Sequence, residues 1–167
     1  MATQLFEVLT LPSGQTIKNR IAKAAMEENL AIEGFAPGER LIRLYEKWSR
    51  GGAGLLITGN VMVDHRAMTG PGGVALEADS VLEPFLRWSR AAKSGGAKVW
   101  MQINHPGRQV YAAMGGEVLS ASDIALDMGR YSKLFGQPKA MDEVDIHSLI
   151  ERFVTTAEKA VEAGFDG

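Results

Sequence analysis

Apolar residues recur with helical spacing after Pro37-Gly38-Glu39, where a proline and a glutamate favour the first turn of a helix. The spacing i, i+3, i+4, i+7 makes one apolar stripe, which consists of Leu41, Leu44, Tyr45 and Trp48. Gly51-Gly52 follows, and glycine allows the left-handed backbone that ends many helices. The continuous apolar run Leu55-Leu56-Ile57 comes next. It is typical of a strand in a parallel sheet that is covered on both faces.

The same pattern recurs further along the chain, with Gly51-Gly52 and Gly95-Gly96 lying 44 residues apart. Either Asp79 or Ser80 is expected to cap the second helix. Its predicted inward side chains are Leu82, Phe85, Leu86 and Ala92. Val99 to Ile103 is predicted to be the next strand. A repeated strand and helix of this length indicates a repeating β/α architecture.

A third amphipathic helix is predicted from Asp142 to Ala163, and Asp142 with Asp145 has the spacing of a capping box. Its predicted inward stripe is Ile146, Leu149, Ile150, Phe153, Ala157, Ala160 and Val161. Residues 1–19 are predicted to form a short hairpin, and residues 21–26 a strand of small side chains. Phe165-Asp166-Gly167 is expected to begin a further strand.

Three parallel strands and three helices leave an open sheet edge with unpaired backbone groups. A right-handed β/α repeat of this unit length closes into an eight-stranded barrel of about 250 residues. The predicted fold class is therefore α/β. We expect residues 1–167 to be the N-terminal portion of a (β/α)8 TIM barrel, an N-terminal hairpin plus about three β/α units, incomplete as given. The open edge predicts a homo-oligomer or association with another chain.

A polar cluster follows the predicted third strand. Gln102 is an amide within that strand, and Asn104, His105 and Arg108 come directly after it. Loops at the carboxyl ends of parallel strands converge, so this cluster is a candidate ligand site. A polar turn that satisfies its own backbone groups is the alternative. His105 is expected to anchor the loop through hydrogen bonds to the backbone.

Composition narrows the class of protein further. The chain has 167 residues, of which 46% are hydrophobic, enough for a real core. A net charge of -2 and a pI of about 5.9 favour neither nucleic acid nor an anionic membrane as a partner. There is no cysteine, which excludes disulfides and thiolate metal sites and fits a cytoplasmic location. The start of the chain lacks the pattern of a signal peptide, and the apolar runs are too short to cross a bilayer.

Several short motifs, in order and spacing, make the chain resemble the Old Yellow Enzyme family, the FMN-dependent NADH:flavin oxidoreductases and ene-reductases. The motifs are Leu5-Phe6, Ile17-Lys18-Asn19-Arg20-Ile21, Ala24-Ala25-Met26, Gly54-Leu55-Leu56-Ile57-Thr58-Gly59, Gln102-Ile103-Asn104-His105-Pro106-Gly107-Arg108-Gln109 and Ala163-Gly164-Phe165-Asp166-Gly167. The resemblance implies a (β/α)8 barrel with FMN over the carboxyl ends of the strands, and NADH or NADPH as the reductant.

The resemblance also implies which residues contact the flavin. It places Ala24, Ala25, Met26 and Glu27 along the flavin edge, Gly59 under the ring and Gln102 at the pyrimidine portion. An amide both donates and accepts hydrogen bonds, as the flavin rim requires. Small residues let the backbone approach a flat ring closely. The alternative is that the small residues only suit a tight barrel end.

Position 27 departs from the family pattern, which commonly has a hydroxyl or thiol there to donate a hydrogen bond to the flavin carbonyl beside N5. Glu27, when ionised, only accepts hydrogen bonds, and its charge opposes that of the reduced flavin. We therefore predict a lower reduction potential than with threonine. The alternative is that Glu27 turns away to pair with an arginine or a lysine. Asn29 stands where many relatives have an aromatic residue.

The resemblance implies that the whole protein passes hydride from NADH or NADPH, through FMN, to an electron-poor small molecule such as an α,β-unsaturated carbonyl. The family's substrate-anchoring histidine pair and flavin phosphate site would lie beyond Gly167. The isolated chain is therefore expected to bind FMN weakly or not at all and to be inactive. Two alternatives remain: a non-catalytic half-barrel stabilised by self-association, and a different TIM-barrel enzyme acting on a phosphorylated substrate.

Three further expectations concern individual side chains. His65 and His147 are expected to be surface residues. The long segment 110–141 follows the third strand and has the position of a lid or a substrate wall. Within it, Tyr111, Met128 and Tyr131 are expected to pack the loop down rather than to face a substrate.

Overall fold

A computed structural model describes the backbone of residues 2–167 and the side chains of residues 4–167, so Met1 of the predicted hairpin lies outside the described residues. The strands are β1 (Leu9–Thr10), β2 (Thr16–Ile17), β3 (Ala22–Lys23), β4 (Leu55–Met62), β5 (Val74–Ala75), β6 (Lys98–Asn104), β7 (Leu119–Ser120) and β8 (Lys139–Ala140). The α-helices are α1 (Glu39–Arg50), α2 (Glu83–Lys93) and α3 (Glu143–Glu162), and the short 3-10 helices are Ala2–Phe6, Glu33–Phe35, Ala112–Met114 and Gly129–Leu134.

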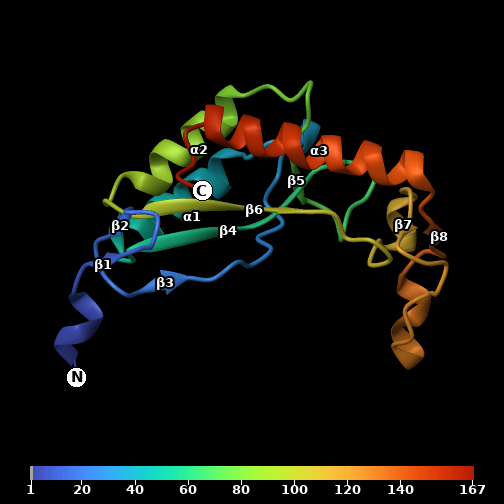
Figure 1. Ribbon diagram of the computed structural model, residues 1–167, viewed down its shortest axis with the longest axis horizontal. Helices are drawn as coiled ribbons and strands as arrows, with labels where there is room; N and C mark the ends of the chain where they lie inside the picture. Colours follow the sequence, from blue (N-terminus) through green and yellow to red (C-terminus); the bar gives the residue numbers. More distant parts are fainter. Residues whose placement is uncertain (1) are drawn as a thin grey trace.

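Strand β4 is the centre of a parallel sheet (Figure 1). β3 pairs with the beginning of β4, and β5 pairs with its end along the same edge. β6 pairs with the opposite edge of β4 over almost its whole length. Beyond β6, the amide of Asp166 donates to the carbonyl of Val99 and the amide of Met101 donates to that of Gly167. The end of the chain therefore continues the sheet as the predicted fourth parallel strand.

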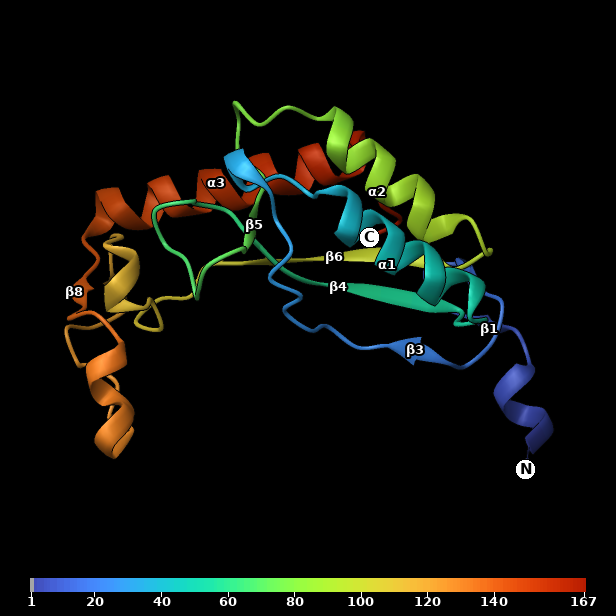
Figure 2. The same cartoon turned by 180° about the vertical axis from the view of Figure 1, so that it is seen from behind.

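The three α-helices cover one face of this sheet, as Figures 1 and 2 show from opposite sides. The main hydrophobic core lies between them and the sheet. Trp88 of α2 is its largest fully buried side chain and meets Tyr45 of α1 edge to face, with ring centroids 5.1 Å apart. Tyr45 itself is completely buried. This one-sided layer, with parallel strands connected through helices, confirms the predicted β/α units.

The glycine pairs end α1 and α2 as predicted. The second glycine of each pair has a positive φ, 99° at Gly52 and 78° at Gly96, a conformation that favours glycine. The first glycine of the second pair is required for a different reason. A β-carbon on Gly95 would collide with the backbone of Ser49 at the end of α1, and the amide of Gly95 donates to the Ser49 hydroxyl at 2.9 Å. The repeated motif thus lets two neighbouring helix ends approach closely.

Two predictions about the helices were wrong. Asp79 and Ser80 do not cap α2, because the helix begins after Leu82 and Ser80 instead accepts a hydrogen bond from the amide of Glu77. The stripe on α3 is buried only in part. Ala160 is buried, whereas several apolar side chains of that stripe and beside it face outward, namely Ile146, Ile150, Val154, Ala157 and Val161. The cause is that α3 packs on β6 and the end of α2, with nothing among residues 4–167 on its outer side.

The strand predictions held with altered bounds: β4 and β6 are longer than predicted, whereas the hairpin strands and β3 are shorter. Pairing of β1 with β2 is antiparallel and confirms the hairpin, although Leu5 and Phe6 belong to a 3-10 helix. The predicted strand 21–26 forms ladder pairs only at Ala22 and Lys23. Residues 24–28 continue beyond the ladder as extended chain toward β4. The predicted capping box on α3 is confirmed, with Asp142 accepting from the Asp145 amide at 2.9 Å.

Residues 110–141 form a projecting segment at the end of the sheet opposite the N-terminus (Figure 1). It contains the short parallel pair β7 and β8 and two 3-10 helices. Among residues 2–167, no helix has the length and apolar character that crossing a membrane would require.

Candidate functional site

The segment that follows β3 packs against Gly59, an interior residue of β4. The carbonyl of Met26 lies directly over this glycine, and the Met26 carbonyl carbon would be 2.9 Å from a β-carbon placed there. The carboxylate of Glu28 approaches the same position at 2.5 Å. A side chain at position 59 would therefore displace residues 26–28, and only glycine allows this contact between the two segments.

A bulge in β4 brings Gln102 beside the same place. Ile57 is opposite Trp100 and Asn60 is opposite Gln102, so β4 has one more residue than β6 over this stretch. The hydroxyl of Thr58 in the bulge accepts a hydrogen bond from the backbone N–H of Gln102 at 2.9 Å. The side-chain amide of Gln102 is half-buried and forms no hydrogen bond with residues 4–167. Its donor and acceptor are thus available to a ligand.

The segment that leaves β3 presents small or backbone groups to its surroundings. Ala24, Ala25 and Met26 are all exposed, and the Met26 side chain has half of its surface accessible. The structure therefore brings together Met26, which follows β3, with Gly59 and Gln102, which lie in the carboxyl-terminal halves of β4 and β6. We call this set of residues, Ala24, Ala25, Met26, Gly59 and Gln102, the strand-end platform.

Glu27 lies beside the strand-end platform and is held by neutral donors. The Asn60 amide donates to its Oε1 at 2.6 Å and the Thr69 hydroxyl donates to the same oxygen at 2.5 Å. No lysine or arginine among residues 4–167 forms an ion pair with it. The predicted alternative, a cationic partner for Glu27, is therefore wrong. The negative charge stays at the strand ends, next to Asn60, the residue opposite Gln102.

A polar network beneath Gly59 was not found from the sequence. The Lys23 ammonium donates to Glu28 Oε1 at 2.9 Å, to the Tyr45 hydroxyl at 2.9 Å and to the carbonyl of Ile57 at 2.8 Å. The Tyr45 hydroxyl donates to Glu28 Oε1 at 2.7 Å and accepts from the amide of Gly59 at 3.1 Å. One signal was present: a lysine within a run of small apolar residues is out of place.

Burial controls the electrostatics of this network. Only 9% of each of the Lys23 and Glu28 side chains is exposed. Burial lowers the pKa of Lys23, an effect that the hydrogen bond and charge of Glu28 oppose. Burial and the nearby Glu28 charge raise the pKa of the Tyr45 hydroxyl far above its ordinary value. Tyr45 therefore stays protonated at every physiological pH and keeps donating to Glu28.

The groups that the strand-end platform presents are suited to a planar cofactor. At Gly59 the place of a β-carbon is taken by the Met26 carbonyl, whereas the Gln102 side-chain amide has an open donor and an open acceptor and the alanines leave the backbone accessible. These are the groups that a flat heterocycle with alternating donors and acceptors would contact. The platform thus fits a flavin ring.

Comparison with known proteins decides the family. The model of the NADH:flavin oxidoreductase / NADH oxidase family matches residues 4–167. The chain belongs to this family. It is 30% identical over 175 residues to the NADH-dependent flavin oxidoreductase iliE of Hypocrea jecorina, covering 95% of this chain and 44% of that protein. It is 30% identical over 166 residues to the NADH:acrylate oxidoreductase of Vibrio harveyi, covering 98% of this chain and 16% of that protein.

A solved structure supports the same fold. The old yellow enzyme homologue from Zymomonas mobilis superposes with a TM-score of 0.85 at 24% identity, over 98% of this chain and 47% of that one. The resemblance to the Old Yellow Enzyme family and the assignment to part of a (β/α)8 barrel are confirmed. Family membership supports FMN as the cofactor with reduced pyridine nucleotide as the reductant. The chain spans less than half the length of these relatives.

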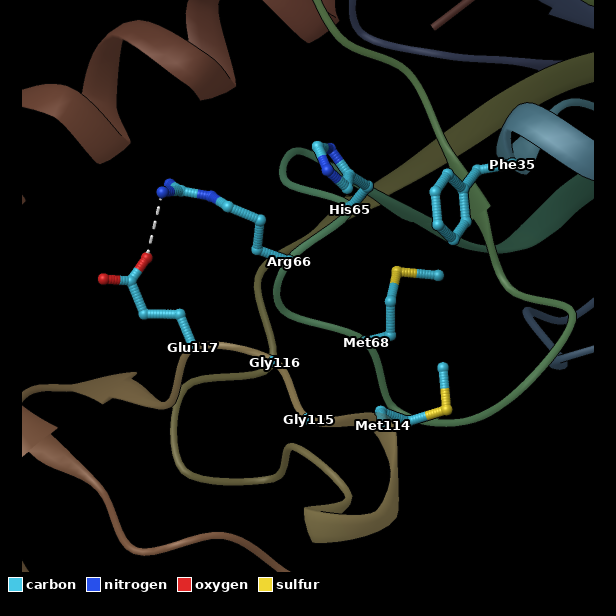
Figure 3. A pocket seen from close by; sticks show the side chains of 8 residues that line it. All are labelled: Phe35, His65, Arg66, Met68, Met114, Gly115, Gly116 and Glu117. Atoms are coloured by element: carbon cyan, nitrogen blue, oxygen red, sulfur yellow. Dashed lines mark ion pairs between the residues drawn. The ribbon is translucent and has the colours of Figure 1, made fainter.

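The loops of this flavin oxidoreductase family member leave a hollow of about 590 Å³ at the same end of the sheet. Figure 3 shows its lining, with Met68 and Met114 on one side and the ion pair between Arg66 and Glu117 on the other. The Arg66–Glu117 distance is 3.2 Å. Phe35, which has a positive φ of 58°, lies 5.4 Å from the His65 ring. The hollow is thus lined by loops that follow β3, β4 and β6.

An ion-pair network ties this end of the sheet to α3. Asp64 is buried and contacts Arg66 at 2.6 Å and Arg152 of α3 at 3.6 Å. Burial alone would raise the pKa of Asp64, but the hydrogen bonds and charges of Arg66 and Arg152 outweigh it, and the pKa is lowered. Asp64 therefore stays ionised and holds the loop after β4 against the third helix.

The histidines have the places predicted for them. His105 accepts a hydrogen bond from the amide of Gly107 at 3.2 Å, which anchors its loop, and burial lowers its pKa. His65 is exposed and pairs with Glu77 at 2.7 Å, and His147 is exposed on α3. In the projecting segment, Tyr111 stacks on Phe135 with centroids 5.2 Å apart, as expected of a loop-packing residue.

The other two side chains that were predicted to pack this segment down are those of Met128 and Tyr131. Both are about half exposed, so they do not pack the loop down as predicted. The reason is geometric: the 3-10 helix that carries Tyr131 lies at the tip of the projecting segment, away from the core (Figure 1).

Proposed function

We propose that residues 1–167 form the N-terminal part of a single FMN-binding barrel, and that the whole protein is an FMN-dependent oxidoreductase. It would transfer hydride from NADH or NADPH, through the flavin, to an electron-poor acceptor such as an activated alkene. The observation that carries this proposal is the convergence of Met26, Gly59 and Gln102 toward the carboxyl-terminal side of three adjacent strands in a chain of this family. The relative named for acrylate, itself an activated alkene, supports the acceptor class.

Each platform residue has a role in this proposal. In this proposal the backbone of Ala24, Ala25 and Met26 lies along the flavin edge, and Gly59 lets the Met26 carbonyl pack against β4 beneath it. Gln102 donates to and accepts from the pyrimidine rim with its free amide. Glu27 places a carboxylate near the redox-active edge. When bound, FMN supplies the hydride chemistry, and the protein contributes position and electrostatic environment.

The test uses the complete barrel protein that carries this sequence. It should purify with, or bind, FMN. Under anaerobic conditions NADH or NADPH should bleach the flavin absorbance, and acrylate or 2-cyclohexenone should restore it. Propionate and cyclohexanone, which lack the alkene, are the matched controls and should leave the flavin reduced. Binding of sugar phosphates without any flavin spectrum would instead support a different barrel enzyme.

The 167-residue chain alone is proposed to bind FMN weakly or not at all, because it spans less than half the length of its relatives and the family's flavin phosphate site is expected in the later barrel strands. We further propose that it associates with a second copy through its open sheet edge and the outward face of α3. The support is the outward apolar face of α3, where Ile150 is 52% and Val161 is 72% exposed. Light scattering should show a dimer, and Ile150→Glu should shift it toward monomer. A monomeric wild-type chain would contradict this.

The remaining partner and location proposals rest on composition. We propose a small-molecule substrate and neither nucleic acid nor membrane as a partner, given the slightly acidic charge of -2. A cytoplasmic location is also proposed, since the absence of cysteine is compatible with a reducing compartment. Cell fractionation followed by immunodetection would check it.

A further inference from the structure

We propose that Lys23, Glu28 and Tyr45 act together as positioning residues that fix the strand-end platform and thereby set flavin affinity and reduction potential, an inference that rests on the proposed function. We call these three residues the supporting triad. They come from β3, from the loop after it and from α1, and they meet behind Gly59.

Every side-chain donor of the supporting triad is engaged within the network. A lysine ammonium has three donors, and those of Lys23 reach Glu28, Tyr45 and the carbonyl of Ile57. The single O–H of Tyr45 is donated to Glu28. Its oxygen accepts from both Lys23 and the Gly59 amide. A fully satisfied buried network of this kind rigidifies the residues that form it, which is what a positioning role requires.

The bulge in β4 explains why such support is required. An extra residue in one strand leaves a backbone group outside the ladder, and a buried N–H without a partner is costly. Here the unpaired group is the amide of Gly59, and the Tyr45 hydroxyl accepts it at 3.1 Å. The peptide is therefore fixed with its N–H toward the helix layer. Gly59 can then lie under the Met26 carbonyl without its amide competing for a ligand.

Within the supporting triad, the contacts of Glu28 fix residues 26–28. Glu28 is drawn inward by Lys23 and Tyr45, and its second oxygen lies beside Gly59. This anchors the segment that carries Met26 and Glu27. Lys23 is held between two aromatic faces, 4.8 Å from the Tyr45 ring centre and 4.6 Å from that of Trp48. Its cation is thereby fixed beside α1, in contact with the carboxylate of Glu28.

The deciding experiment compares two single-hydroxyl deletions in the complete barrel protein. Tyr45→Phe removes the acceptor of the Gly59 amide. Thr156→Val is the matched control, because Thr156 is fully buried and donates to the carbonyl of Leu76 at 2.7 Å, in the helix layer. Both variants lose one buried hydrogen bond, and both urea midpoints should fall by similar amounts. Only Tyr45→Phe should raise the Kd for FMN, by about tenfold, and shift the visible flavin spectrum and the reduction potential.

The outcomes separate the two proposals. If the wild-type protein binds no FMN, the proposed function fails. If the wild type binds FMN but Tyr45→Phe matches Thr156→Val in Kd, spectrum and potential, the positioning role fails and the proposed function stands. Should Tyr45→Phe not fold, Glu28→Gln replaces it. That variant keeps an acceptor for Tyr45 but removes the charge paired with Lys23, and an unchanged flavin potential there overturns the inference.

Discussion

The carbonyl of Met26 lies so close over Gly59 that no β-carbon could be accommodated between them. This contact joins the end of β3 to the bulge of β4 at the place proposed for the flavin ring. Gly59→Ala should therefore displace residues 26–28 and lower FMN affinity at least about tenfold in the complete protein, the loss of one or more well-placed contacts. Flavin fluorescence titration measures the change.

The matched control for that substitution is Gly70→Ala. A β-carbon there would have only ordinary contacts, the nearest being the Tyr111 ring at 3.4 Å, and Gly70 has no positive φ. Its FMN affinity should remain that of the wild type. Equal losses in the two variants would show that the contact between Met26 and Gly59 has no special part in binding.

Gln102→Leu should weaken FMN binding by about tenfold, because leucine has a similar size but neither donates nor accepts a hydrogen bond. The backbone bond from Gln102 to Thr58 is retained, so the strand should keep its register. Gln109→Leu, on the exposed loop after β6, is the control. Calorimetric titration would compare them, and an unaltered Kd for Gln102→Leu would remove this residue from the proposed site.

Glu27→Thr should raise the flavin reduction potential, since it replaces a carboxylate that disfavours the anionic reduced flavin with a group that can donate. A rise of about 30 mV corresponds to a tenfold change in preference for the reduced form of a two-electron couple. Potentials are measured against a reference dye. Glu158→Thr, an equal charge change on the exposed surface of α3, should have no such effect; a potential unmoved by Glu27→Thr argues that Glu27 does not face the flavin.

His105 should make the stability of the chain dependent on pH below neutrality. Its pKa is lowered by burial, and its Nδ1 accepts from the Gly107 amide, so protonation is disfavoured in the folded state. As the pH falls below about 6.5, the unfolded chain takes up the proton first and stability declines until the folded pKa is passed. Above that range His105 contributes no pH dependence.

The measurement is the urea midpoint at pH 7.5 and pH 5.5. His105→Gln should lose less stability on acidification than the wild type. His147→Gln, an exposed histidine on α3, should lose as much as the wild type. An identical decline in all three proteins would assign the acid sensitivity to other groups.

Asp142→Ala should destabilise the chain by about 1 kcal/mol, because it removes the capping box at the start of α3. Asp79→Ala is an informative comparison. The sequence suggested a cap there as well, but α2 begins after Leu82, so this change should be close to neutral. Thermal unfolding followed by circular dichroism would test both, and similar midpoints would contradict the assigned cap.

Only one member of the platform was singled out by its own sequence context, Gln102, a lone amide in an apolar strand. The positions of Ala24, Ala25, Met26 and Gly59 were expected from the resemblance to the Old Yellow Enzyme family. The supporting triad could not be anticipated in the same way. Tyr45 was correctly placed on the apolar stripe of α1, but its hydroxyl meets Lys23 and Glu28 only when β3 and α1 are packed.

Local sequence patterns by themselves determined the β/α repeat, the glycine helix ends and the capping box of α3, because each depends on residues close together in the chain. The tertiary structure decided which apolar faces are buried and where polar groups meet. Ile150 has the helical spacing of a core residue yet is exposed, since burial depends on a neighbouring element and not on periodicity. The bulge at Gly59 likewise arises from the register between β4 and β6, a relation between distant segments that local sequence does not encode.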